Sequence, residues 1–121
     1  MTPEALWKRY AATWSLGVEE REPELAACLG EDVTYCDPNH IAETRNALSA
    51  YMDQFQRGLP GGQFQIGSVL EHHGRSLARW ALHGKDGTVL QTGTSFGLLA
   101  EDGRLCAISG FFDPLVGKTP A

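Results

Sequence analysis

The stretch RGLPGGQFQIG, residues 57–67, separates two kinds of sequence and decides the fold. Its centre, residues 59–62, combines proline with two glycines, which is typical of a turn. Before it, apolar residues recur mostly at helical spacing, whereas after it apolar and polar residues alternate as they do in strands. The sequence therefore predicts helices mainly in the first half and a sheet in the second half.

Three helices are expected before this turn. Thr2 is placed to cap a first helix, whose apolar face spans residues 6–14. A shorter helix is expected after Pro23 and ends at Gly30, because glycine often terminates a helix. A third helix is expected over about residues 44–57.

Four strands are expected after the turn, each joined to the next by a glycine-containing tight turn. Their expected ranges are residues 63–73, 75–84, 88–99 and 104–112. Helices segregated from an antiparallel meander indicate an α+β fold, with one domain over residues 1–121 and a loose end at 117–121. We expect the sheet to be strongly curved and cone-shaped, wrapped around the first helix with a hollow between them.

Composition excludes several classes of partner. The 121 residues are 42% hydrophobic and carry a net charge of −5, so no basic surface for nucleic acid is expected. No apolar segment approaches the roughly 20 residues that cross a bilayer, so no membrane partner is expected. Three cysteines at unrelated spacings indicate reduced thiols and a cytoplasmic protein.

Asp37 ends an alternating segment, EDVTYCD at residues 31–37, that precedes a proline. Alternation puts Val33, Tyr35 and Asp37 on one face of a strand and Cys36 on the other, so a cysteine nucleophile is not expected. Asp37 then has two interpretations. It is either a turn residue that accepts backbone N–H bonds, or a carboxylate in the hollow that is suited to proton transfer.

Four segments carry a family resemblance: KRYAATWSLG (8–17), EDVTYCDPN (31–39), EHHGRSLARW (71–80) and DGRLCAISGFFD (102–113). Together with the order of elements, they resemble the cone-shaped nuclear transport factor 2-like superfamily, which includes SnoaL-like polyketide cyclases and ketosteroid isomerases. The resemblance to ketosteroid isomerases implies catalytic roles for two residues. Asp37 matches their proton-shuttling base, and Tyr10 matches their catalytic tyrosine. Their second oxyanion donor is a protonated aspartic acid, and here that place falls on Thr94 or Ser95.

The resemblance also implies an apolar cavity and no cofactor. His72 and His73 are adjacent in a strand and should point to opposite faces, so no metal site is expected. Two positions are open for them: one of the two lines the cavity, with the choice between them undecided, or they lie on the surface or in the hairpin. The residues expected to line the cavity are Trp14, Tyr35, Tyr51, Phe55, His73, Trp80, Thr94, Ser95, Phe96 and Phe111.

Two functions follow from these expectations. The first is a cofactor-free isomerase, cyclase or dehydratase that moves a proton next to a carbonyl. The second is a non-catalytic carrier of a small hydrophobic ligand, or a dimerising module, with the same fold. In each case a homodimer through the sheet face opposite the helices is expected, because that face is too large to remain apolar and exposed.

Overall fold

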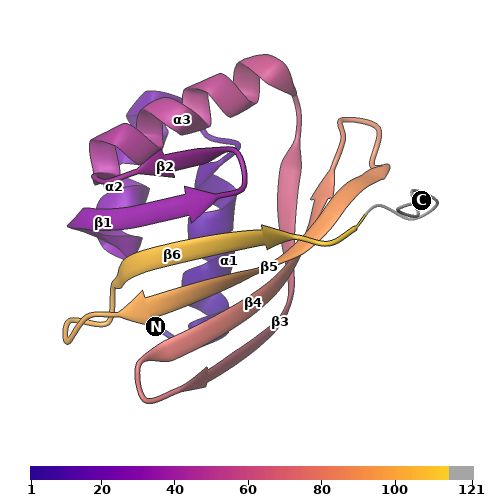
Figure 1. Ribbon diagram of the computed structural model, residues 1–121. Coiled ribbons are helices and arrows are strands. Elements are labelled where there is room, and N and C mark those ends of the chain that lie inside the picture. Colours follow the sequence, from indigo (N-terminus) through magenta and orange to yellow (C-terminus); the bar gives the residue numbers. More distant parts are fainter. Residues whose placement is uncertain (115–121) are drawn as a thin grey trace.

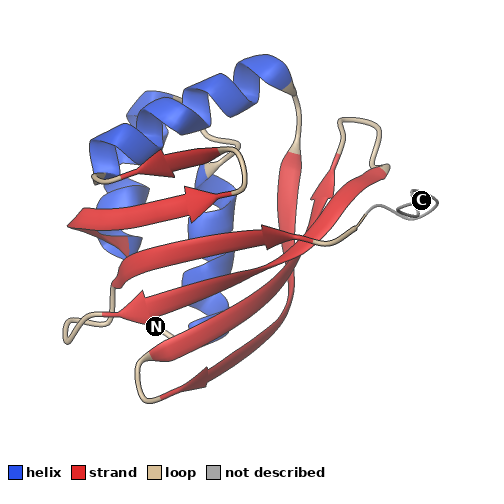
Figure 2. Ribbon diagram, in the orientation of Figure 1, coloured by secondary structure: helices blue, strands red, loops and turns tan. Residues whose placement is uncertain are grey.

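The computed structural model of the protein describes residues 1–114, which form three helices and six strands (Figures 1 and 2). In chain order the elements are α1 (Pro3–Thr13), α2 (Val18–Cys28), β1 (Leu29–Asp37), β2 (His40–Ala42), α3 (Arg45–Gly58), β3 (Gln63–His72), β4 (Arg75–His83), β5 (Val89–Leu99) and β6 (Leu105–Phe112). The expected α+β class is confirmed. The expectation of a loose end at 117–121 concerns residues outside the described part.

Two helices begin at side-chain caps. The Thr2 hydroxyl accepts a 3.1 Å hydrogen bond from the Ala5 N–H at the start of α1. The Thr44 hydroxyl accepts one of 3.0 Å from the Ala47 N–H at the start of α3. Such bonds satisfy N–H groups that have no partner within the helix.

The second helix begins before Pro23, not after it, so that boundary was wrong. Arg21 explains the earlier start, because this fully buried side chain ties the first turn of α2 to α3. Its guanidinium donates to the Ser49 hydroxyl at 3.0 Å and to the Asp53 carboxylate at 2.6 Å. The helix ends at Cys28, and Gly30 already belongs to β1.

The six strands form one sheet in the order β2-β1-β6-β5-β4-β3 (Figure 1). Neighbouring strands are antiparallel except β1 and β6, which run parallel. These two strands lie side by side in the sheet and are far apart in the sequence. The three-residue strand β2 was not expected. It forms a hairpin with β1, in which Asp37 pairs with His40.

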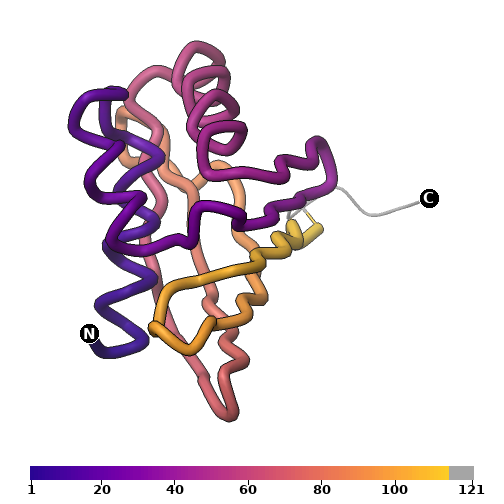
Figure 3. Tube along the Cα trace, turned by 90° about the vertical axis from the view of Figure 1, so that its left-hand side faces the viewer, coloured from indigo at the N-terminus to yellow at the C-terminus, as the bar shows by residue number. Residues whose placement is uncertain are grey.

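The helices lie against one face of the curved sheet (Figures 1 and 3). On this inner face α1 contacts β3, and α3 contacts β1 and β2. The core between them includes Trp7, Leu48, Met52 and Ile108, each at most 2% exposed.

Two glycines on the inner face of β5 make room for tryptophan rings. A Cβ atom on Gly97 would lie 2.6 Å from Leu105 Cδ2 and 2.8 Å from Trp7 Cζ2. A Cβ atom on Gly93 would overlap the Trp80 indole and a backbone carbonyl. The absence of side chains at these two positions therefore lets both indoles lie directly on the sheet.

Candidate functional site

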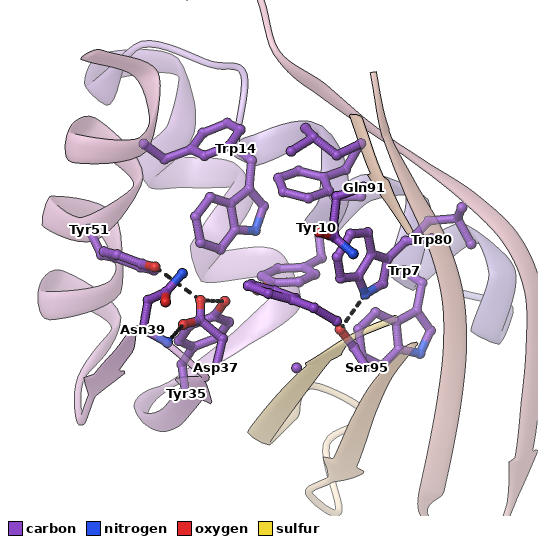
Figure 4. Close-up of a pocket in the computed structure, with 17 residues that line it drawn as sticks. Trp7, Tyr10, Trp14, Tyr35, Asp37, Asn39, Tyr51, Trp80, Gln91 and Ser95 are labelled. Atoms are coloured by element: carbon purple, nitrogen blue, oxygen red, sulfur yellow. Dashed lines mark hydrogen bonds between the residues drawn. The ribbon is translucent and has the colours of Figure 1, made fainter. Parts of the chain in front are cut away.

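A cavity of about 270 Å³ lies between α1, α3 and the inner face of the sheet (Figure 4). Seventeen residues line it, and more than half of them are aromatic. A small concave site with an apolar lining and a few polar groups is the usual form of a small-molecule site.

Asp37 projects into this cavity from the end of β1 (Figure 4). Its Oδ2 accepts hydrogen bonds from the Tyr35 hydroxyl at 2.6 Å and from the Tyr51 hydroxyl at 3.0 Å. Its Oδ1 accepts the Asn39 N–H at 2.8 Å, which closes a turn over Pro38. Both interpretations of Asp37 therefore describe part of its geometry, because one oxygen closes the turn and the other takes two hydroxyl groups inside the cavity.

Tyr10 comes from α1 and is 5% exposed. Among the tyrosines of the described chain, Tyr35 and Tyr51 donate to Asp37, whereas the Tyr10 hydroxyl has no acceptor there. Burial raises the pKa of Tyr10 well above its ordinary value; the Trp14 side chain partly opposes this rise, and the negative charge of Asp37 adds to it. Tyr10 is therefore a neutral O–H group available to a ligand oxygen.

The pKa values of the two tyrosines that donate to Asp37 are also raised. Burial is the largest cause for both, and the hydrogen bond and charge of Asp37 add to it. The pKa of Tyr51 rises to about 12. The ring of His40, the first residue of β2, stacks on the Tyr51 ring with the ring centres 4.1 Å apart. This contact helps to fix the orientation of Tyr51.

The sheet supplies the opposite wall of the cavity. The Trp80 indole N–H donates to the Ser95 hydroxyl at 3.1 Å, so the hydrogen of that hydroxyl remains available to a ligand. The Gln91 amide donates from Nε2 to the backbone carbonyls of Thr92 and Asp113, both at 2.8 Å. Its carbonyl oxygen is therefore the part of the side chain that can accept from a ligand.

Eight of the twelve residues predicted for the site line this cavity. They are Tyr10, Trp14, Tyr35, Asp37, Tyr51, Phe55, Trp80 and Ser95. Cys36 is absent from the lining, and its sulfur lies 3.6 Å from the Ser109 hydroxyl.

Three predicted lining residues lie on the outer face of the sheet, so their assignment to the cavity was wrong. Thr94 accepts a 2.6 Å hydrogen bond from Arg79 there and pairs across the strands with Phe111, which is 61% exposed. Phe96 is two positions after Thr94 and therefore shares its face. Ser95 lies between these two residues in the strand and therefore points to the inner face, where it lines the cavity. Of Thr94 and Ser95, the cavity thus contains Ser95.

The assignment of His73 to the cavity was also wrong. His73 has a positive φ of 48° and lies in the turn between β3 and β4, where strand alternation no longer applies. The Nδ1 atoms of His72 and His73 are 3.1 Å apart on the surface, and neither residue lines the cavity. Within residues 1–114, no three His, Cys, Asp or Glu side chains come together as a metal site requires.

The sequence-based prediction missed nine lining residues. They are Trp7, Ala11, Asn39, Phe64, Ile66, Leu82, Gln91, Gly110 and Phe112. Strand alternation from Trp80 would have indicated Leu82, and alternation from Ser95 would have indicated Gln91. Asn39 carried no signal of this kind, because it lies in the turn before the unexpected strand β2.

Comparison with known proteins gives the family and the fold. The family profile of the SnoaL-like domain matches residues 7–108. No curated protein matches the chain. In the described residues, no helix has both the length and the apolar character needed to cross a bilayer.

Three similar solved structures show the range of relatives. A SnoaL-like family protein from Agrobacterium tumefaciens, proposed to be an isomerase, is 26% identical, with a TM-score of 0.87 over 94% of this chain and 100% of that one. A nuclear transport factor 2-like protein from an Exiguobacterium species is 17% identical, with a TM-score of 0.73 over 91% and 99% of the two chains. A Catenulispora acidiphila protein with a ketosteroid isomerase-like fold, solved in complex with trimethylamine, is 15% identical, with a TM-score of 0.74 over 93% and 88%. The chain therefore belongs to the SnoaL-like domain family and has its cone-shaped, nuclear transport factor 2-like fold.

Proposed function

We propose that the protein binds a small, mainly apolar molecule with a carbonyl group and moves a proton at the carbon next to that carbonyl. The observation that carries the proposal is the placement of Asp37, the one carboxylate among the described residues that line this mainly aromatic cavity. A carboxylate can act as a general base there, and a neutral tyrosine can stabilise the developing oxyanion. The reaction needs neither a metal nor an organic cofactor.

In the proposed reaction a carboxylate oxygen of Asp37 takes the proton from the carbon. The electron pair of the broken C–H bond forms the carbon–carbon double bond of an enolate, whose oxygen accepts hydrogen bonds from Tyr10 and Ser95. Return of the proton from Asp37 to a different carbon gives an isomer. Attack of the enolate carbon on a second carbonyl of the same molecule gives a ring, and the new alkoxide takes the proton from Asp37. Loss of a β-hydroxyl, which leaves as water with that proton, gives a dehydrated product. The lining residues serve these three outcomes equally, so the proposal is made for the class.

The hydrogen bonds of Asp37 indicate which oxygen acts. Both lone pairs of Oδ2 are occupied by Tyr35 and Tyr51, whereas Oδ1 accepts one bond, from Asn39. A carboxylate oxygen accepts about two hydrogen bonds, so Oδ1 has a lone pair for a substrate proton. The two tyrosines then act as positioning residues that fix the direction of this lone pair.

The same contacts favour a second candidate, a non-catalytic carrier. A carboxylate held by three hydrogen-bond donors can also serve only to bind a ligand, and the cavity of about 270 Å³ suits a small molecule. Turnover decides between the enzyme and the carrier.

The test is the rate of proton exchange and isomerisation of small enolisable ketones by the wild type, two cavity variants and one control variant. Asp37→Asn should lower the rate by roughly 10²–10⁴-fold, since it removes the base. Tyr10→Phe should lower it by roughly 10-fold to 100-fold, since Ser95 remains as a donor. Asp86→Asn serves as the matched control, because Asp86 accepts a similar turn bond, from the Thr88 N–H at 3.0 Å, outside the cavity lining. Ketones that bind without turnover in the wild type would support the carrier and refute the enzyme.

We also propose that the protein is a homodimer through the outer face of the sheet. The strand register places Leu77, Phe96 and Phe111 on this face, together with Leu70 and Leu98. Four of these five are exposed, Leu70 to 69% and Phe111 to 61%. Several exposed apolar side chains on one face, here beside the Arg79–Asp113 ion pair, are typical of an interface. Light scattering at tens of micromolar should give the mass of a dimer, and a monomer would refute this interface.

We also propose a cytoplasmic location, since Cys28, Cys36 and Cys106 are free thiols.

A further inference from the structure

The charge inventory of the cavity is one-sided. Among residues 1–114, its lining contains one carboxylate, Asp37, and no lysine, arginine or histidine. The other polar groups are neutral side chains from Asn39, Gln91, Ser95 and the tyrosines. A negatively charged ligand would therefore lie beside a carboxylate with no cation to offset either charge.

Within the described part of the chain, Asp37 has hydrogen-bond donors but no counter-ion. Its three partners, two hydroxyls and one backbone N–H, are all neutral. The ion pairs of residues 1–114 lie elsewhere, at Arg9–Glu24, Arg21–Asp53, Arg79–Asp113 and Arg104–Asp102. After burial, the charge of Asp37 is among the causes that raise the pKa of Tyr10, Tyr35 and Tyr51. A positive charge inside the cavity would lie in the field of Asp37.

The rest of the lining is also favourable to a cation. Nine of the seventeen lining residues are aromatic: Trp7, Tyr10, Trp14, Tyr35, Tyr51, Phe55, Phe64, Trp80 and Phe112. Aromatic faces attract cations, tryptophan most strongly, and the attraction increases where water is excluded. Trp14 lies between 5.4 and 5.7 Å, centre to centre, from Tyr35, Tyr51, Phe55 and Phe64, so these rings form one continuous cluster beside Asp37.

The balance between nine aromatic residues and a few acceptors in the lining selects the kind of cation. A primary ammonium group has three N–H donors and must find an acceptor for each, or lose the hydration that water gives it. Besides tyrosine and serine hydroxyl oxygens, the lining offers acceptors at Asp37 Oδ1 and on the side-chain amides of Gln91 and Asn39. An alkylated ammonium group has few or no N–H donors and can be stabilised by ring faces and one carboxylate.

We propose that the ligand of this cavity carries a small alkylated ammonium group, held over the aromatic cluster with Asp37 as its counter-ion. This inference rests on the proposed use of the cavity as a small-molecule site, but it does not depend on Asp37 acting as a base. It adds a selection rule to that function: organic cations are preferred to neutral molecules of the same shape, and anions are excluded.

The test is a comparison of two molecules of nearly identical shape. Choline carries a trimethylammonium group, and 3,3-dimethylbutan-1-ol carries a neutral tert-butyl group in its place. Titration calorimetry with the wild-type protein should give choline at least tenfold tighter binding than its neutral counterpart. The carboxylate 3,3-dimethylbutanoate should not bind.

Two cavity variants and one control variant show which residues cause the preference for a cation. Asp37→Asn should lower the ratio of the two affinities severalfold, because it removes the counter-ion while keeping the shape of the side chain and the ring faces. Asp86→Asn removes one negative charge outside the cavity lining and should leave the ratio unchanged. Because Asp37→Asn also changes hydrogen bonds, Trp14→Leu provides a second measurement and should lower choline affinity more than affinity for the neutral alcohol.

The possible results distinguish failure of the cation preference from failure of the proposed function. Equal or tighter binding of the neutral alcohol overturns the cation preference and leaves small-molecule binding intact. An unchanged ratio in Asp37→Asn overturns the role of Asp37 as counter-ion. If choline and the alcohol both fail to bind, the cation inference is overturned, and the ketone measurements alone then decide the proposed function.

Discussion

Replacing Asp37 with asparagine will show how strongly the tyrosine contacts stabilise the folded protein. The carboxylate accepts three hydrogen bonds, from Tyr35, Tyr51 and the Asn39 N–H. Asparagine has one carbonyl oxygen, so it cannot keep all three. If that oxygen faces the tyrosines, the amino group opposes the N–H of residue 39, and if it faces residue 39, the hydroxyls lose their acceptor.

The expected cost follows from these contacts. A hydrogen bond to a charged acceptor contributes about 1.5–3 kcal/mol, and one between neutral groups about 0.5–1.5 kcal/mol. Asparagine loses one or two of the charged bonds and weakens the remainder, while the desolvation cost of the half-buried carboxylate disappears and offsets part of the loss. The net expectation is a destabilisation of about 2 kcal/mol, or a fall of about 8 °C in the unfolding midpoint at about 4 °C per kcal/mol for a domain of this size.

Thermal and urea unfolding at neutral pH provide the measurement, with Asp86→Asn as the matched control. Asp86 closes a similar turn with the Thr88 N–H. Asparagine can keep that single bond, so this variant should unfold close to the wild type. An Asp37→Asn protein that is as stable as the control, or more stable than the wild type, would refute the reasoning, because the tyrosine contacts would then contribute nothing net.

Two further predictions follow from the cavity and its glycines. All three tyrosines of the chain have raised pKa values, with that of Tyr51 at about 12, so at about pH 11 the folded protein should show little tyrosinate absorbance, whereas the unfolded chain ionises near pH 10. Because the folded state keeps these protons longer, stability should fall as the pH rises from about 10 through 12, and tyrosinate absorbance that develops near pH 10 in the folded state would contradict the geometry. Gly93→Ala should destabilise the protein by about 1–3 kcal/mol in urea unfolding, since its methyl would overlap the Trp80 indole. Gly110→Ala is its control, because there the methyl would lie 3.5 Å from Asp37 Cβ, an ordinary contact, and equal effects of the two changes would contradict the packing described.

The elements with strong local signals could be predicted from the sequence. Thr2 caps the first helix as expected, and the alternation of Val33, Tyr35 and Asp37 places Tyr35 and Asp37 in the cavity. The strand β2 could not be predicted in the same way, because three residues, His40–Ala42, are too few to show a period.

The inward face of β5 was harder to predict because its buried positions are glycines, whereas its large apolar side chains lie on the opposite face. Large apolar residues such as Phe96 and Leu98 normally indicate the buried face of a strand. In β5 the buried positions are Gly93 and Gly97, since tryptophans from α1 and β4 fill the space above them. The hydrophobic pattern of β5 alone therefore indicates the wrong face, and it becomes interpretable only when the positions of Trp7 and Trp80 are known.

The parallel pairing of β1 with β6 has a consequence for how the protein is made. Cys36 on β1 pairs with Ser109 on β6, which is 73 positions later in the chain. During synthesis the edge of β1 next to Asp37 therefore has no partner until nearly the whole chain has left the ribosome. Contacts between such distant segments close large loops and slow folding. A nascent chain that stops before residue 105 contains Tyr10, Asp37 and both tyrosine donors, but the strand that completes the wall beside Asp37 has not yet been synthesised.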